Sequence, residues 1–176
     1  MRSLLAYRIT LPALLAVGLV MLQSAASFAD VGITYSDAVT GVSFAVPAAL
    51  YVSAASPGVG GRTTQAIFST FARNLDPKVT RVDLSRELTI TAYVVSRAPG
   101  EDLRAFLARN VHGSPYVVTD MPRLHGIVAQ GLFQSGPRKY ALVPRDPDHV
   151  LVVDAYPAFS SRIGLFDSVL ATLVVK

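Results

Sequence analysis

The strongest candidate for a catalytic or metal-binding segment is Asp146-Pro147-Asp148-His149, which places two carboxylates and an imidazole within four residues. Oxygen and nitrogen ligands of this kind can hold Zn²⁺, Mn²⁺ or Ca²⁺. The spacing matches neither an EF-hand loop nor a zinc signature, and proline and aspartate are also standard residues of hairpin turns. We therefore predict a turn here, with metal binding as the alternative.

The other candidates for catalysis are dispersed along the chain. The three histidines, His112, His125 and His149, would have to converge in the fold to bind zinc. Serine, histidine and an acid are all present, but there is no G-x-S-x-G elbow, and Ser135-Gly136 and His112-Gly113-Ser114 resemble turns. We predict no catalytic residue, no bound metal and no cofactor.

A glycine-rich segment at 58–64 invites comparison with a phosphate-binding loop. Its sequence, Gly58-Val59-Gly60-Gly61-Arg62-Thr63-Thr64, lacks the lysine of G-x-x-x-x-G-K-[ST], and no clear buried strand precedes it. We interpret it as a flexible loop.

A basic stretch begins in this loop and extends to residue 86. It could dock an acidic partner or a lipid headgroup, although a solvated surface would have the same composition. Aromatic residues do not alternate with the charges, as they would in a single-stranded nucleic-acid site. The basic residues are Arg62, Arg73, Lys78, Arg81 and Arg86, against Asp76 and Asp83.

The first 29 residues predict where the protein works. Arg2 and Arg8 give a basic start, an apolar run follows over 9–22, and Ser27-Phe28-Ala29 offers small residues for a signal peptidase. This order is typical of a secretory signal peptide. The apolar run is shorter than the roughly twenty residues of a spanning helix, so an uncleaved anchor is the weaker alternative. We expect cleavage near Ala29 and a periplasmic or secreted protein.

The remaining residues, Asp30 to Lys176, have the length of one ordinary domain. The absence of cysteine rules out disulfides, thiolate ligands, a cysteine nucleophile and lipoprotein anchoring, and suits a bacterial periplasm. The formal charge of +4 falls to near +2 without the two leader arginines. A charge this small does not indicate binding to nucleic acid or to an anionic membrane. No later apolar run could span a membrane.

The first half of the domain reads mainly as strands. Val42, Phe44 and Val46 alternate with polar or small residues, and Leu88 to Ser96 alternates most clearly. Loops are predicted over 53–61 and 74–86. The predicted strands cover 33–36, 42–46, 63–72 and 88–96.

A helix follows over 101–110, with Glu101 and Asp102 in its first turn, an apolar stripe and a stop at His112-Gly113. The stripe is Leu103, Phe106 and Leu107. Strands are predicted at 127–134, 139–143 and 150–156, with turns at Gly136-Pro137 and 144–148.

A second helix is predicted over 162–171, with an apolar face of Ile163, Phe166, Val169 and Leu170, and a closing strand over 173–175. Because strands and helices are segregated rather than alternating, we predict an α+β domain: an antiparallel sheet with helices packed on it.

Three places resemble the PsbP-like family: the start from Tyr35-Ser36-Asp37 to Gly41-Val42-Ser43-Phe44-Ala45-Val46-Pro47, the helix after a long strand, and the end at 166–173. The family often has Gly-Trp after this proline, whereas Pro47 precedes Ala48-Ala49-Leu50 and the chain has no tryptophan. The resemblance implies a three-layer αβα sandwich that serves as a docking or assembly factor. It carries over no catalytic residue.

These observations favour an exported, non-enzymatic protein that binds a protein partner, its identity unknown. One alternative is a small periplasmic hydrolase or metal-dependent enzyme that uses His125 or the 146–149 turn. Another is a small-ligand or lipid-binding module with its pocket between sheet and helix. Convergent polar residues in a cleft would favour the enzyme, a flat exposed patch the partner, and a closed apolar cavity the carrier.

Overall fold

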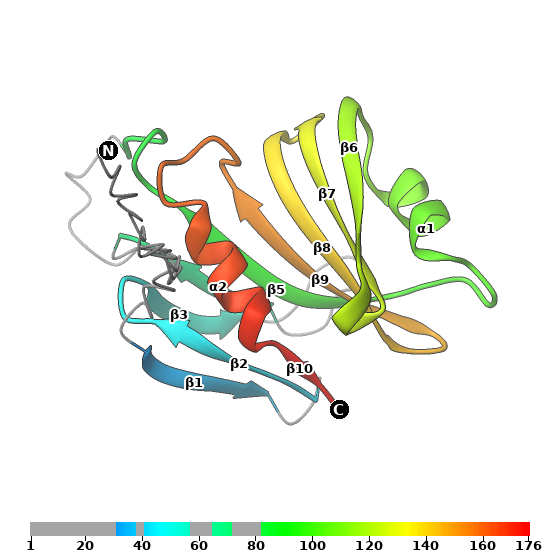
Figure 1. Cartoon of the computed structure of the whole chain (residues 1–176), viewed down its shortest axis with the longest axis horizontal. Helices are drawn as coiled ribbons and strands as arrows, with labels where there is room; N and C mark the ends of the chain where they lie inside the picture. Colours follow the sequence, from blue (N-terminus) through cyan, green and yellow to red (C-terminus); the bar gives the residue numbers. More distant parts are fainter. Residues whose placement is uncertain (1–30, 38–40, 57–64, 72–81) are drawn as a thin grey trace, which may run out of the picture.

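The structure is a computed structural model, and it describes residues 31–37, 41–56, 65–71 and 82–176 (Figure 1). A seven-stranded sheet dominates it, in the order β3-β4-β5-β9-β8-β7-β6, and all paired strands run antiparallel. The strands are β3 (Tyr51–Ser56), β4 (Gln65–Ser69), β5 (Thr89–Ser96), β6 (Gly113–Met121), β7 (Gly126–Phe133), β8 (Gly136–Asp146) and β9 (His149–Tyr156).

A second sheet of three strands joins the two ends of the described chain. It contains β1 (Val31–Asp37), β2 (Val42–Pro47) and β10 (Val174–Val175), with β2 in the middle. Gly41, before β2, has φ +68°, and a Cβ there would lie 3.0 Å from the Lys176 carbonyl oxygen. Glycine is therefore required where the last residue crosses the start of β2.

The two helices cover opposite faces of the large sheet, which confirms the predicted α+β architecture (Figure 1). Helix α2 (Gly164–Thr172) and the small sheet lie on one face, and α1 (Leu103–Asn110) lies on the other. A short 3₁₀ helix, Pro122–Leu124, links β6 to β7. The alternation in β5 divides its residues between two cores, because successive strand residues point to opposite faces.

The first core lies between the large sheet, the small sheet and α2. Phe44 from β2 packs on Phe68 from β4 with ring centroids 5.2 Å apart, and Tyr35 from β1 packs on both. The predicted apolar face of α2 joins them: Phe166, Val169 and Leu170 are buried and Ile163 is partly buried.

The second core lies beneath α1. Phe106 and Leu107 are both buried, as their helical spacing predicts. They pack among side chains from four strands: Tyr93, Ile127, Ala129, Phe133, Tyr140, Leu142, Val150 and Val152.

Two strands were not predicted. Residues 51–56 form the edge strand β3, so the loop prediction is wrong over 53–56, and residues 57–61 lie outside the described part. Small side chains made this segment resemble a loop, although backbone pairing with β4 holds it as a strand. At the other edge, β6 escaped prediction because Pro115 and Asp120 interrupt its apolar pattern; an edge strand tolerates proline.

The limits of α1 also differ from the prediction. Asp102 is the N-cap, and its carboxylate accepts the backbone N–H groups of Arg104 and Ala105 at 2.8 Å, so it stands before the first turn rather than in it. The helix ends at Asn110. Gly113 begins β6 instead of stopping the helix, and a Cβ there would lie 2.5 Å from the Phe133 Cα.

Both predicted hairpin turns are displaced. Gly136-Pro137 begins β8, and the preceding turn is centred on Gln134-Ser135. Strand β8 then continues to Asp146, which leaves only Pro147-Asp148 as the turn before β9. The pairing of β8 with β9 therefore extends further than the turn residues in the sequence indicate.

Arg123 holds the C-terminal end of α2. Its guanidinium donates to the carbonyl oxygens of Leu170 and Leu173. We expect Arg123→Met to lower the free energy of unfolding by about 1.5–3 kcal/mol, because charge-assisted bonds to helix-end carbonyls are lost. Urea unfolding measures this. The exposed Arg162 provides the control, and an equal loss on Arg162→Met would contradict the capping role.

Candidate functional site

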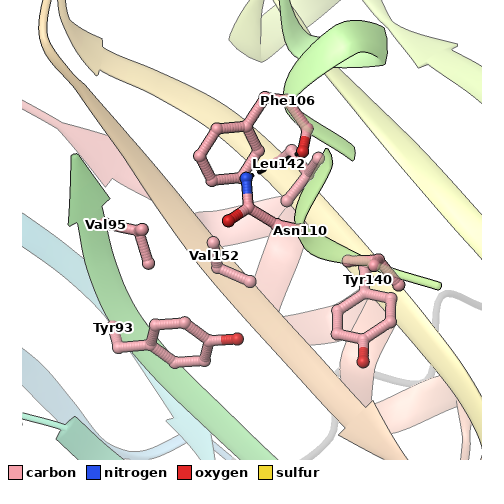
Figure 2. A pocket seen from close by; sticks show the side chains of 8 residues that line it. Tyr93, Val95, Phe106, Asn110, Tyr140, Leu142 and Val152 are labelled. Carbon is pink, nitrogen blue, oxygen red and sulfur yellow. Dashed lines mark hydrogen bonds between the residues drawn. The ribbon is translucent and has the colours of Figure 1, made fainter. Parts of the chain in front are cut away.

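A pocket of about 160 Å³ lies between the end of α1 and the central strands of the sheet (Figure 2). Helix α1 supplies one wall, and β5, β8 and β9 supply the floor. Most of the lining side chains are apolar, whereas polar atoms make up a comparable share of the accessible surface. It comprises Tyr93, Val95, Phe106, Asn110, Val111, Tyr140, Leu142 and Val152.

The sheet register brings the floor residues together. Val152 in the centre of the floor pairs with Tyr93 on one side and with Leu142 on the other. Tyr140 is two residues from Leu142 on β8 and so faces the same side. Because α1 has only eight residues, it ends over these strands instead of covering them completely.

Three lining residues have polar side-chain atoms. The Asn110 side-chain Nδ2 donates to the Phe106 carbonyl oxygen at 2.9 Å, and Figure 2 shows its oxygen directed to the other side. The hydroxyl of Tyr93 points from β5 toward Val152 in the same view. The Tyr140 hydroxyl lies 3.4 Å from the Ser135 Oγ. The described lining contains no carboxylate, imidazole or amine side chain.

The start of α1 is fixed to the neighbouring hairpin. Arg97 donates to the carbonyl oxygens of Asp146 and Pro147, at 3.1 and 2.8 Å, and to that of Glu101 at 3.4 Å. Glu101 in turn accepts two bonds of 2.7 Å from Arg109 on α1. The helix wall of the pocket is therefore held from both its first and last turns.

This arrangement predicts acid sensitivity. The hydrogen bond from Arg109 lowers the pKa of Glu101, and the Ala98 backbone N–H adds to the effect, against a smaller opposing desolvation. A carboxyl whose pKa is lowered by folding stabilises the fold above its unfolded pKa, near 4.3, and that stability is lost as pH falls through the folded value. We expect Glu101→Gln to reduce the free energy of unfolding at pH 6 and to matter less near pH 3, as measured by urea unfolding.

The matched variant is Arg109→Gln, which removes the arginine that donates to Glu101. The two changes together should cost less than the sum of each alone, because they abolish the same interaction. Additive losses, or an equal loss at both pH values, would contradict the assignment.

The structure places the 146–149 segment at the β8–β9 turn. Desolvation raises the pKa of Asp146, but hydrogen bonds from His149 and the Asp148 backbone N–H, aided by nearby charges, outweigh it and lower the pKa. The His149 Nδ1 lies 2.8 Å from the Asp146 Oδ1, whereas the Asp148 backbone N–H donates to the same oxygen. This is the geometry of an aspartate-stabilised turn, as the sequence predicts.

The histidines lie on separate elements: His112 follows α1, His125 follows the 3₁₀ helix at φ +50°, and His149 begins β9. Within residues 31–37, 41–56, 65–71 and 82–176, no three His, Asp or Glu side chains gather as a metal site. Ser135 lies in the β7–β8 turn, and Ser114 lies within β6.

Most of the basic stretch lies outside the described residues, as does the glycine-rich segment. This applies to Arg62, Arg73, Lys78 and Arg81. Arg86 is described and exposed, in the turn before β5. It lies near the beginning of β5, whereas the pocket residues Tyr93 and Val95 lie toward its end, so Arg86 and the pocket are separate.

Sequence reasoning named no pocket residue as a site, although Phe106 and Tyr93 were assigned to their elements. The available signal was the combination of a short helix with an amide at its end, Asn110, and tyrosines on neighbouring strands. None of the helices in the described residues is long and apolar enough to cross a bilayer.

No protein-family model matches the chain, and no curated protein matches it significantly. Among solved structures, the solution structure of cyanobacterial PsbP (CyanoP) from Synechocystis sp. PCC 6803 is similar, with a TM-score of 0.48 and 13% sequence identity. The match covers 83% of this chain and 95% of that chain. This similar structure is that of a PsbP, and the sequence also resembles the PsbP-like family.

Proposed function

We propose that this is an exported, non-enzymatic protein that binds a protein partner by receiving one aromatic or branched side chain in the pocket beneath α1. The observation that carries the proposal is the pocket itself: a cavity of about 160 Å³ at the end of a short helix, lined by apolar side chains, two tyrosines and one amide, with no acid or base in its described lining. The signal-peptide pattern of the first 29 residues supports export.

The volume of the pocket determines which of the candidate occupants can fit. An engineered apolar cavity of about 150 Å³ accommodates one benzene molecule. Sites for drug-sized ligands have roughly 300–1,000 Å³, so a lipid chain or a large metabolite does not fit. One ring or one branched side chain does. Buried side-chain anchors of this kind supply much of the binding energy of protein interfaces.

Site-specific photocrosslinking in the source cells tests this function. A benzoylphenylalanine at Val111, which lines the pocket, should give one discrete crosslinked product. The product should disappear when Val95→Phe fills the pocket, and it should decrease when p-cresol competes for the space. The same photoreactive residue at Val117, whose exposed fraction is 71%, is the control on a surface outside the pocket.

Crosslinking that survives both Val95→Phe and p-cresol would show that the partner does not use the pocket. Thermal unfolding of Val95→Phe checks that the fold is retained. Binding of p-cresol without any crosslinked protein would favour the small-ligand alternative over the partner.

The basic stretch contributes a second, electrostatic prediction. Charge reversal at Arg73, Arg81 and Arg86 should weaken partner binding and reduce its salt dependence, while the melting temperature stays nearly unchanged, because exposed charges that attract a partner mainly alter the rate of association. A salt-dependent pull-down with the identified partner measures this. If the triple variant binds the partner normally, the basic stretch is a solvated surface that takes no part in binding.

A further inference from the structure

Resting on the proposed function, we infer that the pocket beneath α1 selects a tyrosine side chain of the partner over phenylalanine, with the Asn110 side-chain oxygen as the selecting group. The inference concerns the chemistry of the occupant, which the volume alone does not determine. It follows from the orientation of one amide in a lining whose other polar side-chain groups are two tyrosine hydroxyls.

The orientation of the Asn110 amide is fixed by helix α1. The Phe106 carbonyl oxygen can only accept, so the side-chain atom 2.9 Å from it must be the donor, Nδ2. A flipped amide would bring two acceptors together. The side-chain oxygen Oδ1 therefore faces away from Phe106, toward the space between α1 and β5 (Figure 2).

An amide oxygen accepts hydrogen bonds and cannot donate. A phenylalanine ring brings no donor for this acceptor and so gains no hydrogen bond from it. A tyrosine ring brings a hydroxyl that can donate to it. A carboxylate would place a second acceptor against Oδ1, and the described lining offers no cation to offset it. The Tyr93 hydroxyl can donate or accept, so it does not discriminate between occupants.

The test uses the two side chains themselves as probes, p-cresol for tyrosine and toluene for phenylalanine. NMR titration of the full-length protein gives both dissociation constants. We expect p-cresol to bind roughly fivefold to tenfold more tightly than toluene, the effect of one net hydrogen bond.

Asn110→Leu removes the acceptor at similar size and should abolish the preference while toluene still binds. Asn110 is exposed, and thermal unfolding verifies that the variant folds. Gln130→Leu makes the same amide-to-leucine change on an exposed β7 residue that lies outside this pocket, and it should retain the preference. A preference unchanged in Asn110→Leu, or absent in the wild-type protein, overturns the inference.

A second pair of probes determines whether the ring arrives on a polypeptide. N-acetyl-tyrosinamide should bind at least as tightly as p-cresol and better than N-acetyl-phenylalaninamide. Binding of p-cresol without the amide would overturn the partner side chain as occupant. If toluene and p-cresol both fail to bind, the pocket is not a binding site and the proposed function fails. If both bind equally, only the selectivity fails.

Discussion

Replacing Phe106 by alanine is expected to lower the free energy of unfolding by about 3–5 kcal/mol, the range for removing a buried phenylalanine ring. The ring is 2% exposed and packs in the core beneath α1, where it also forms a wall of the pocket. The Arg109 guanidinium lies 5.6 Å from its centroid, so part of the loss is a cation–π contact. Urea unfolding measures the change.

The control for Phe106→Ala is Phe159→Ala. Phe159 is 58% exposed, and surface substitutions of this kind usually alter the free energy of unfolding by less than about 0.5 kcal/mol. A loss below about 1 kcal/mol for Phe106→Ala would mean that the helix does not pack as described. The same variant enlarges the pocket, so its selectivity between p-cresol and toluene should weaken.

Replacing Phe44 by alanine is expected to cost a similar amount, about 3–5 kcal/mol. Phe44 is 2% exposed and lies between the rings of Tyr35 and Phe68, with centroids 5.2 Å away in each case. These three residues join the small sheet to the large one. Each aromatic pair adds about 0.5–1.5 kcal/mol beyond its buried area.

Phe44→Ala also tests whether the two sheets unfold together. A single cooperative transition at lower urea concentration is the expected result. An unfolding curve with two transitions would contradict one shared core. Binding of p-cresol to the folded variant should be unchanged, because Phe44 lies on the face of the sheet opposite the pocket.

Local sequence pattern predicted the elements whose apolar residues are regularly spaced. The sequence of β5 alternates as in a strand, although both of its faces are buried, and the apolar face of α2 lies at helical spacing and is the side that is buried. Strands β3 and β6 depend instead on backbone pairing at the two edges of the sheet. Their side chains carry little of that information, which is why the sequence did not reveal them.

A pocket between sheet and helix was one of the sequence-based alternatives, but its lining residues could not be predicted from local pattern because they are brought together by three separate facts. Helix α1 ends at Asn110, the register places Val152 between Tyr93 and Leu142, and Asn110 turns its amide onto its own helix. Each is a consequence of long-range packing or of a side-chain rotamer. The 146–149 turn, by contrast, is local, and its residues predicted its role as a turn.

The most direct test of the account is a methyl-region NMR titration of the protein with p-cresol. The account predicts saturable shifts at the pocket valines Val95, Val111 and Val152, with Val42 and Val46 in the other core unchanged. Shifts confined to Val42 and Val46, shifts scattered over all valines, or no shifts at millimolar p-cresol would contradict a binding site beneath α1.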